Sequence, residues 1–250
     1  MPETNSQFLD GRMRTGRRRL VPMPSPPLAL RAAIARLARF YGRPPRPPAS
    51  DPFALVIWEN CAYLVDDARR AVVFARLKRA VGLEPAAILA TPLPALAGII
   101  EEGGMLALRR AEKLHAAAET ALEIGPTELR RLVRRAPLEA SKVLKRFPGI
   151  GEPGADKLLL FCKAHRTLGP DSNALRVLVR LGYGTGSDNY GRMYRSAAKA
   201  VAPHLPADFA WLISAHQLLR RHGQELCKRA APRCEACPLS TGCRWYLAHR

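Results

Sequence analysis

Residues 146–161, RFPGIGEPGADKLLLF, place a glycine turn between two helical patterns and decide the fold of the chain. Gly149 and Gly151 flank Ile150 in this turn. Glycine admits positive φ angles and close backbone approach, so the chain can reverse sharply before the next helix begins. We expect Ile150 to be buried and to anchor the turn in the core.

The start of the following helix is suited to binding a phosphate group. Its first N–H groups have no partner within the helix, and they carry a partial positive charge. Lys145 and Arg146 precede the turn and add attraction for a polyanion. An ordinary corner between two helices is the alternative interpretation of the same residues.

The rest of the chain predicts an all-α protein. Apolar residues recur at helical spacing, and no run of alternating β-branched residues predicts a strand. The proline-rich segment 43–52 predicts a linker. The predicted helical segments are residues 28–42, 53–82, 85–91, 93–100, 105–125, 127–136, 138–147 and the one after the turn.

The charge of the chain predicts a polyanionic partner. Its 40 Lys and Arg residues outnumber 21 Asp and Glu residues, which gives a formal charge of +19. Nucleic acid is a better match than a membrane surface, and no apolar run approaches the ~20 residues that cross a bilayer. Residues 1–27 are basic and then proline-rich, which predicts a disordered arm that either contacts DNA phosphates or is a solvated tail.

Cysteines near the C-terminus predict a metal centre. Their spacing is C-x6-C-x2-C-x5-C, and the members are Cys227, Cys234, Cys237 and Cys243. In a cytosolic protein such a group favours metal ligation over disulfides, and its chemistry allows zinc or an iron–sulfur cluster. The other two cysteines, Cys61 and Cys162, lie in apolar helical patterns and are predicted to be buried thiols.

Both motifs resemble one protein family. PGIG before a helix is similar to the helix-hairpin-helix motif, and HGQELCKRAAPRC resembles the [4Fe-4S] loop of the endonuclease III family of DNA glycosylases. The resemblance implies a [4Fe-4S] cluster with a structural role. It also implies that Arg233, in the same loop, contacts DNA phosphates.

The resemblance covers residues 30–246 and implies two all-α domains. The first is a six-helix barrel over residues 50–168, which includes the hairpin. The second is a discontinuous iron–sulfur domain formed by residues 28–49 and 169–250. Double-stranded DNA would lie across the cleft between them, with the target base flipped into it.

A carboxylate follows the hairpin helix in the segment LGPDSNALRVLVRLGYG, residues 168–184. It resembles the family pattern V-D-T-H-x-x-R-V, which places Asp171 at the catalytic aspartate, with Ser172 and Asn173 in place of Thr-His. A fixed carboxylate stabilises the positive charge that develops on the sugar when a glycosidic bond breaks. Asp171 also precedes a predicted helix, so it is a candidate N-cap, and the two roles are compatible.

The position that is a nucleophilic lysine in bifunctional family members is Pro153 here. Proline has no free amine, but it suits the first turn of a helix. The resemblance therefore implies a monofunctional glycosylase. Lys157 lies one turn further along the same helix face, so it is either a displaced nucleophile or a solvated or phosphate-contacting lysine.

A second carboxylate occurs in DPFALVIWEN, residues 51–60. This segment resembles the start of the barrel in adenine glycosylases and places Glu59 at their catalytic glutamate. There it would protonate the departing base, and burial would raise its pKa. A structural acid paired with an arginine is the alternative. The residues that follow differ from that family, and Tyr63, Asn60 or Asp67 is predicted to shape a different base pocket.

These features together predict a base-excision-repair enzyme that flips a damaged or mismatched base and hydrolyses its N-glycosidic bond. We expect a cytoplasmic, nucleoid-associated monomer with weak or absent lyase activity. One alternative is a bifunctional glycosylase that uses Lys157. The other is a DNA lesion-binding protein without turnover.

Overall fold

The computed structural model describes residues 28–250, and this part of the chain folds into helices, turns and loops without a strand. Within these residues, the only β-type pairing is an isolated bridge between Tyr63 and Gly104. The all-α prediction is confirmed. The arm predicted over residues 1–27 lies outside the described residues.

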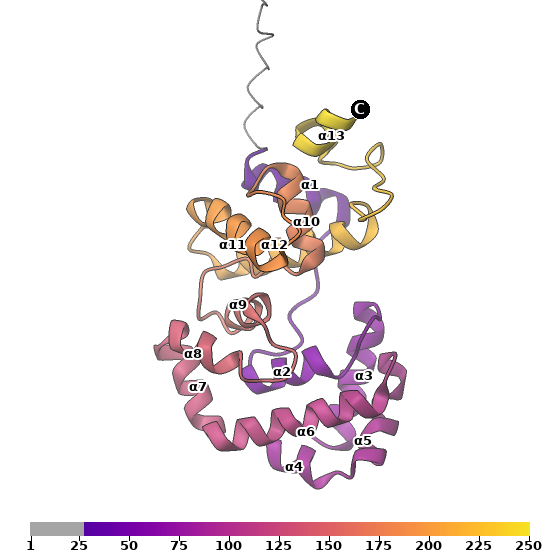
Figure 1. Cartoon of the computed structure of the whole chain (residues 1–250), viewed down its shortest axis with the longest axis vertical. Helices are drawn as coiled ribbons and strands as arrows, with labels where there is room; N and C mark the ends of the chain where they lie inside the picture. The colour runs from indigo at the N-terminus through magenta and orange to yellow at the C-terminus, as the bar shows by residue number, and fades with distance from the viewer. Residues whose placement is uncertain (1–27) are drawn as a thin grey trace, which may run out of the picture.

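The helices follow one another along the chain with short connections (Figure 1). They are α1 (Leu30–Tyr41), α2 (Pro52–Asn60), α3 (Asp67–Ala80), α4 (Pro85–Ala90), α5 (Leu93–Ile99), α6 (Ala107–Ile124), α7 (Pro126–Arg135), α8 (Pro137–Leu144), α9 (Glu152–Phe161), α10 (Ser172–Leu181), α11 (Tyr190–Val201), α12 (Phe209–Glu225) and α13 (Arg244–His249), with 3-10 turns at Glu101–Gly103, Ala202–His204 and Ser240–Gly242.

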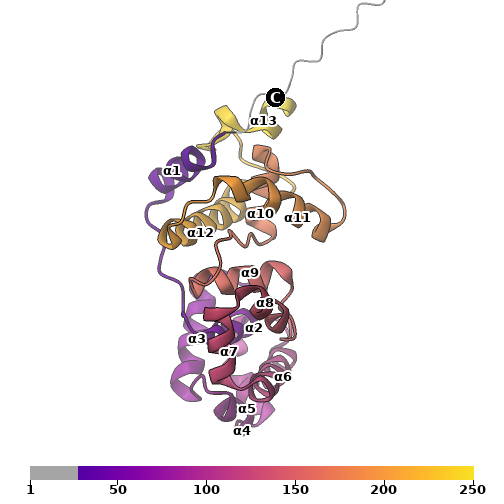
Figure 2. The same ribbon diagram turned by 90° about the vertical axis from the view of Figure 1, so that its left-hand side faces the viewer.

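The helices gather into a lower and an upper body, and α9 lies between them (Figures 1 and 2). In the lower body α6 packs against α2, α4, α5 and α7. In the upper body α12 packs against α10 and α1, and α9 contacts α2 and α8 below and α12 above. One apolar core runs through both bodies, so α9 joins them by side-chain packing as well as by chain connection. The predicted domain boundaries at residues 49 and 168 stay a prediction.

Acidic N-caps begin two of the helices that carry the candidate site. Asp51 accepts from the Ala54 N–H at the start of α2, and Asp66 accepts from the Arg69 N–H at the start of α3. A carboxylate at this position satisfies a free backbone donor and interacts favourably with the helix dipole.

The helical pattern predicted over residues 53–82 is interrupted in the structure. Helix α2 ends at Asn60 and α3 begins at Asp67. Leu64, in the connection, has a φ of 57°, which a continuous helix does not allow. The prediction of one segment was wrong because apolar spacing continues across the break, whereas the Asp66 cap starts a new helix.

Arg110 holds this connection against the loop before α6. Its side chain is buried, at 4 % exposure, and its guanidinium donates to five backbone carbonyls. The accepting residues are Cys61, Ile100, Glu101, Gly104 and Met105. No acidic side chain is among these partners, so Arg110 satisfies backbone carbonyls of both segments at once.

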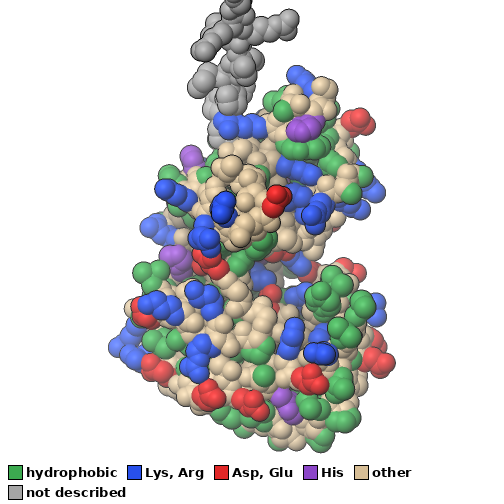
Figure 3. All heavy atoms as spheres, in the orientation of Figure 1, with side chains coloured by type: hydrophobic (Ala, Val, Ile, Leu, Met, Phe, Trp, Pro, Cys, Tyr) green, Lys and Arg blue, Asp and Glu red, His purple; other side chains and the backbone are tan. Residues whose placement is uncertain are grey.

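Basic side chains occur on both bodies of the molecule. Figure 3 shows a hollow between the bodies with Lys and Arg side chains above and below it. Within residues 28–250, no helix combines the length and apolar character needed to cross a membrane.

Candidate active site

The glycine turn joins α8 to α9 and is held from below by α2. Gly149 has a φ of 73°, and a Cβ there would lie 3.0 Å from the Asn60 Oδ1. The Asn60 Nδ2 donates to the carbonyls of Pro148 and Val56, both at 3.0 Å. Ile150 is 5 % exposed, which confirms that it anchors the turn in the core.

The hairpin leaves the basic residues before it on the surface. Lys145 and Arg146 are exposed, and the Arg146 guanidinium forms an ion pair with Glu123 at 2.9 Å. Arg233, in the cysteine loop, is also exposed. All three side chains are accessible to a polyanion, and their contact with DNA stays a prediction.

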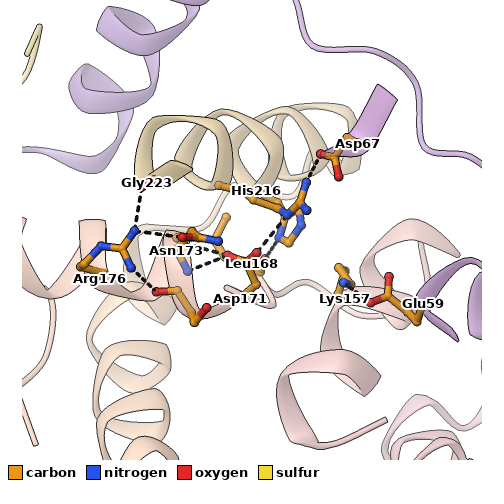
Figure 4. A network of polar contacts seen from close by, with 12 residues as sticks. Glu59, Asp67, Lys157, Leu168, Asp171, Asn173, Arg176, His216 and Gly223 are labelled. Atoms are coloured by element: carbon orange, nitrogen blue, oxygen red, sulfur yellow. Dashed lines mark hydrogen bonds and ion pairs between the residues drawn. The ribbon is translucent and has the colours of Figure 1, made fainter. Parts of the chain in front are cut away.

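Pro153 is the second residue of α9, where its missing N–H costs no hydrogen bond of the helix. One turn later, the Lys157 Nζ donates to the Glu59 Oε2 at 2.7 Å (Figure 4). Only 14 % of the Lys157 side chain and 18 % of the Glu59 side chain are exposed. The expectation of a solvated lysine was wrong, and the partner of Glu59 is a lysine rather than an arginine.

The protonation of Glu59 differs from the sequence-based expectation. Burial alone would raise the pKa of Glu59, but the charge and hydrogen bond of Lys157 and the charges of Arg70 and Arg220 more than offset it. The pKa of Glu59 is therefore lowered, not raised. At neutral pH Glu59 is a carboxylate that accepts the hydrogen bond of the Lys157 Nζ.

Asp171 is the N-cap of α10, as the sequence predicts. Its Oδ1 accepts from the N–H groups of Asn173 and Ala174, at 3.0 and 2.9 Å. Its Oδ2 accepts from the Arg220 Nε at 2.9 Å, and Arg220 also pairs with Asp67 on α3. Arg220 thus joins the candidate catalytic carboxylate to the lower body.

The segment before Asp171 lies directly on α9. Gly169 has a φ of 48°, and a Cβ there would lie 2.6 Å from the backbone nitrogen of Lys157. Only glycine allows this approach. The buried His216 of α12 holds the same segment through its Nδ1, 2.8 Å from the Leu168 carbonyl oxygen (Figure 4).

A cleft of about 400 Å³ opens where these groups meet, which is in the size range of roughly 300–1,000 Å³ typical of small-molecule sites. Glu59 and Lys157 line it from below and Arg220 lines it from above. Tyr63 is 53 % exposed and, like the buried Asn60, is not among the lining residues. The predicted pocket roles of these two residues are not supported by their positions.

Two arginines of the cleft, Arg70 on α3 and Arg220 on α12, were not anticipated from the sequence. Neither belongs to a recognisable motif. Arg220 meets its two partners across 49 and 153 residues of chain, so local patterns carry no signal for the contacts. The one signal in the sequence for a pocket wall was the aromatic Trp58 next to Glu59, which lines the cleft.

The four C-terminal cysteines line one cavity of the upper body, beside α10 and α12. His222 of α12 lies between this loop and α1, with its Nε2 3.4 Å from the Cys237 Sγ and its Nδ1 3.0 Å from the Tyr41 hydroxyl. Arg176 of α10 donates to the Cys227 carbonyl at 2.7 Å. The donor set fits a group that takes four sulfur ligands. No three His, Cys, Asp or Glu side chains of residues 28–250 are grouped for a single metal ion.

The remaining cysteines are not part of this cavity. Cys61 is buried and Cys162 is partly buried, and burial raises the pKa of both thiols to about 12. Both are therefore protonated and unreactive at neutral pH, in line with the predicted structural role.

Known proteins share this arrangement. No protein-family model matches the chain. Endonuclease III of Sulfolobus acidocaldarius is 32 % identical over 106 residues, which are 42 % of this chain and 44 % of that protein. Adenine DNA glycosylase of Schizosaccharomyces pombe is 28 % identical over 147 residues, 57 % of this chain and 29 % of that protein. Over the matched residues, the chain is thus similar in sequence to endonuclease III and to an adenine DNA glycosylase.

Solved structures extend the likeness to the whole fold. A non-covalent endonuclease III–DNA complex superposes with a TM-score of 0.67 at 23 % identity, over 88 % of this chain and 96 % of that one. A thermostable thymine-DNA glycosylase gives a TM-score of 0.67 at 19 % identity, over 88 % and 97 %. At these identities the likeness concerns the fold alone. The matched region spans less than half the length of the curated endonuclease III sequences, 44 % and 47 % for two of them.

Proposed function

We propose that the protein is a base-excision-repair DNA glycosylase that binds double-stranded DNA, flips a damaged or mismatched base into the cleft and hydrolyses its N-glycosidic bond. The observation that carries the proposal is that Glu59, Lys157 and Arg220 line one cleft, and that Asp171 lies next to it as the ion-pair partner of Arg220. These groups come from four separate helices or helix ends. Such convergence of charged groups in a cleft is typical of active sites.

Asp171 is the group that would stabilise the cationic sugar. As the C1′–N bond breaks, positive charge develops on the deoxyribose, and a fixed carboxylate lowers the energy of that state. Arg220 neutralises Asp171 in the free protein, but it also has Asp67 as a partner. Arg220 can therefore release Asp171 to the sugar without losing a counter-charge.

Glu59 and Lys157 would act as a pair on the departing base. Because Glu59 is ionised and accepts a hydrogen bond from the Lys157 Nζ, the Lys157 side chain would be the acid of the pair and the carboxylate would orient it. This differs from a protonated glutamate that acts alone. It assigns Lys157 a role that needs no covalent bond to the sugar.

The same geometry favours monofunctional action. A lysine nucleophile must be a neutral amine, whereas Lys157 is held as an ammonium beside a carboxylate, and Pro153 has no amine. We expect an intact abasic site as the product and no protein–DNA adduct on borohydride treatment. Robust trapping that disappears in Lys157→Ala would instead support the bifunctional alternative.

Cys227, Cys234, Cys237 and Cys243 would hold the proposed [4Fe-4S] cluster, which would supply structural cross-linking of the loop rather than base chemistry. All four cysteines line the same cavity, which supports their binding one shared group.

A panel of duplexes tests the proposal, each with one modified or mismatched base, under single-turnover conditions. Base release followed by strand cleavage only after added alkali is the expected result. Tight binding to a lesion with no release from any duplex would support the lesion-binding alternative.

A further inference from the structure

Cationic and acidic side chains both line the cleft, and one of the cationic donors has no protein acceptor within residues 28–250. The lining includes four cationic side chains: Arg70 from α3, Lys157 from α9, and Arg220 and Arg221 from α12. Each ammonium or guanidinium carries several N–H groups and no acceptor. What the cleft binds therefore depends on which of these donors remain free.

Arg70 is the donor without an acceptor. Its Nε is buried and has no hydrogen-bond partner within the described part of the chain. The guanidinium carbon lies 5.7 Å from the centre of the Trp58 ring, which holds the group by a cation–π contact instead. A buried donor without an acceptor is uncommon, and at a cleft wall it indicates a partner supplied by a ligand.

The acidic residues of the cleft are already engaged. Each accepts a hydrogen bond from a protein donor: Glu59 from Lys157, Asp66 from the Arg69 N–H, Asp67 from Arg220 and Glu225 from Arg221. The Glu59 Oε2 takes the Lys157 bond, so its Oε1 is left for one further N–H. The Arg70 Nε is therefore a spare donor in a cleft where the Glu59 Oε1 is an available acceptor.

We propose that the cleft selects a base with a lactam or imide edge, that is, carbonyl oxygen next to a ring N–H, and without an exocyclic amino group. Uracil, hypoxanthine and xanthine, the bases formed when amino groups are lost by hydrolysis, have such edges. Their carbonyl oxygens accept from Arg70 and Lys157, and the ring N–H donates to Glu59. An exocyclic amino group at the same place would direct its own N–H bonds toward these cations. The inference rests on the proposed glycosylase activity.

The chemistry of the departing base agrees with this choice. The C1′–N bond breaks with its electron pair on the base nitrogen, the water oxygen bonds to C1′, and the proton that water loses ends on the base. Carbonyl groups spread the negative charge of the departing base over their oxygens. The cations of the cleft then stabilise that charge where it develops, so a protonated glutamate is not required.

Matched pairs of duplexes test the inference with the full chain. Uracil is compared with cytosine, and hypoxanthine with adenine, in the same sequence and opposite the same partner base. We expect single-turnover release to be at least about 10-fold faster for the base with the lactam or imide edge, the effect of one charge-assisted hydrogen bond. Equal or faster release of cytosine or adenine would overturn the inference and leave the glycosylase proposal intact.

Arg70→Gln tests the residue, and Arg76→Gln is the matched control. Arg76 is also on α3, but it pairs with Glu102 on the surface. Arg70→Gln is expected to remove most of the preference within each pair of duplexes, whereas Arg76→Gln leaves this preference unchanged. Thermal stability of both variants is measured in parallel. A uniform loss across all duplexes with Arg70→Gln would identify Arg70 as a phosphate contact and overturn the inference.

Equilibrium binding separates this inference from the proposed function. If no duplex loses its base, the glycosylase proposal fails, but affinities for the same pairs still report the base preference. Tighter binding to uracil than to cytosine that Arg70→Gln abolishes supports the inference. Equal affinities refute it.

Discussion

At the scale of the residue, the candidate catalytic carboxylates each perform a structural task in the free protein. Asp171 caps α10 and pairs with Arg220, while Glu59 is bound by Lys157. Both carboxylates are thus held in place by the cations that neutralise their charge. Substitutions that keep shape and remove charge separate the two roles.

Asp171→Asn is expected to lower single-turnover base release by at least about 10²-fold, because the charge that stabilises the sugar cation is lost. Asparagine is as good an N-cap as aspartate, so the fold and the affinity for DNA should be retained. Asp208→Asn is the matched control, since Asp208 caps α12 through the Ala210 N–H. Base release at the wild-type rate in Asp171→Asn would refute the catalytic role.

Glu59→Gln is expected to change how stability depends on pH. The pKa of Glu59 is lowered in the folded protein from about 4.5, so the ionised group stabilises the fold above that pH. This contribution is lost as the pH falls through the folded-state value. Chemical unfolding between neutral pH and about pH 3 should show wild type more stable than Glu59→Gln at neutral pH, and the gap should close in acid. A constant gap would contradict the ion pair.

At the scale of the element, α12 connects the candidate site to the cysteine loop. On α12, Arg220 pairs with Asp171 of the candidate site. His222, two residues later on the same helix, contacts Cys237 of the loop. His216, one turn earlier, positions the segment that leads to Asp171. A shift of α12 would therefore alter the cleft and the loop together.

The connection between α2 and α3 depends on Arg110 in a similar way. Arg110→Met should remove the donor of five buried or partly buried carbonyl bonds and lower the free energy of unfolding by at least about 3 kcal/mol. Urea unfolding measures the loss. Arg109→Met is the control, because Arg109 is exposed and its change should stay within about 0.5 kcal/mol. If the two variants were equally stable, water would be supplying the hydrogen bonds that Arg110 donates.

At the scale of the whole molecule, two bodies share one apolar core and enclose a charged cleft beside α9. The cysteine loop packs against the upper body only, through α10, α12 and α1. The proposed cluster would therefore hold this loop, and its cysteines do not line the cleft.

Protein purified without oxygen should contain iron and sulfide and be brown. Cys237→Ala should lose both, together with solubility and DNA affinity, before any change in the choice of base. Cys162→Ala, which alters a cysteine far from the loop in sequence and outside its cavity, should retain the iron. Stoichiometric zinc without iron in anaerobic preparations would contradict the cluster.

The sequence by itself determined the features that depend on neighbours along the chain. These are the helices, the glycine turn with Ile150 in the core, the Asp171 cap and the cysteine spacing. Each is encoded within a few residues, because caps, turns and apolar faces are local properties of the backbone.

Only the tertiary structure decided which charges meet in the cleft. Lys157 meets Glu59 across 98 residues, and Arg220 meets Asp171 and Asp67 across 49 and 153. Such pairs depend on the distance between helices and on the direction of long, flexible side chains, neither of which a sequence pattern specifies. The pKa of Glu59 follows from these neighbours, which is why apolar surroundings in the sequence predicted a shift in the wrong direction.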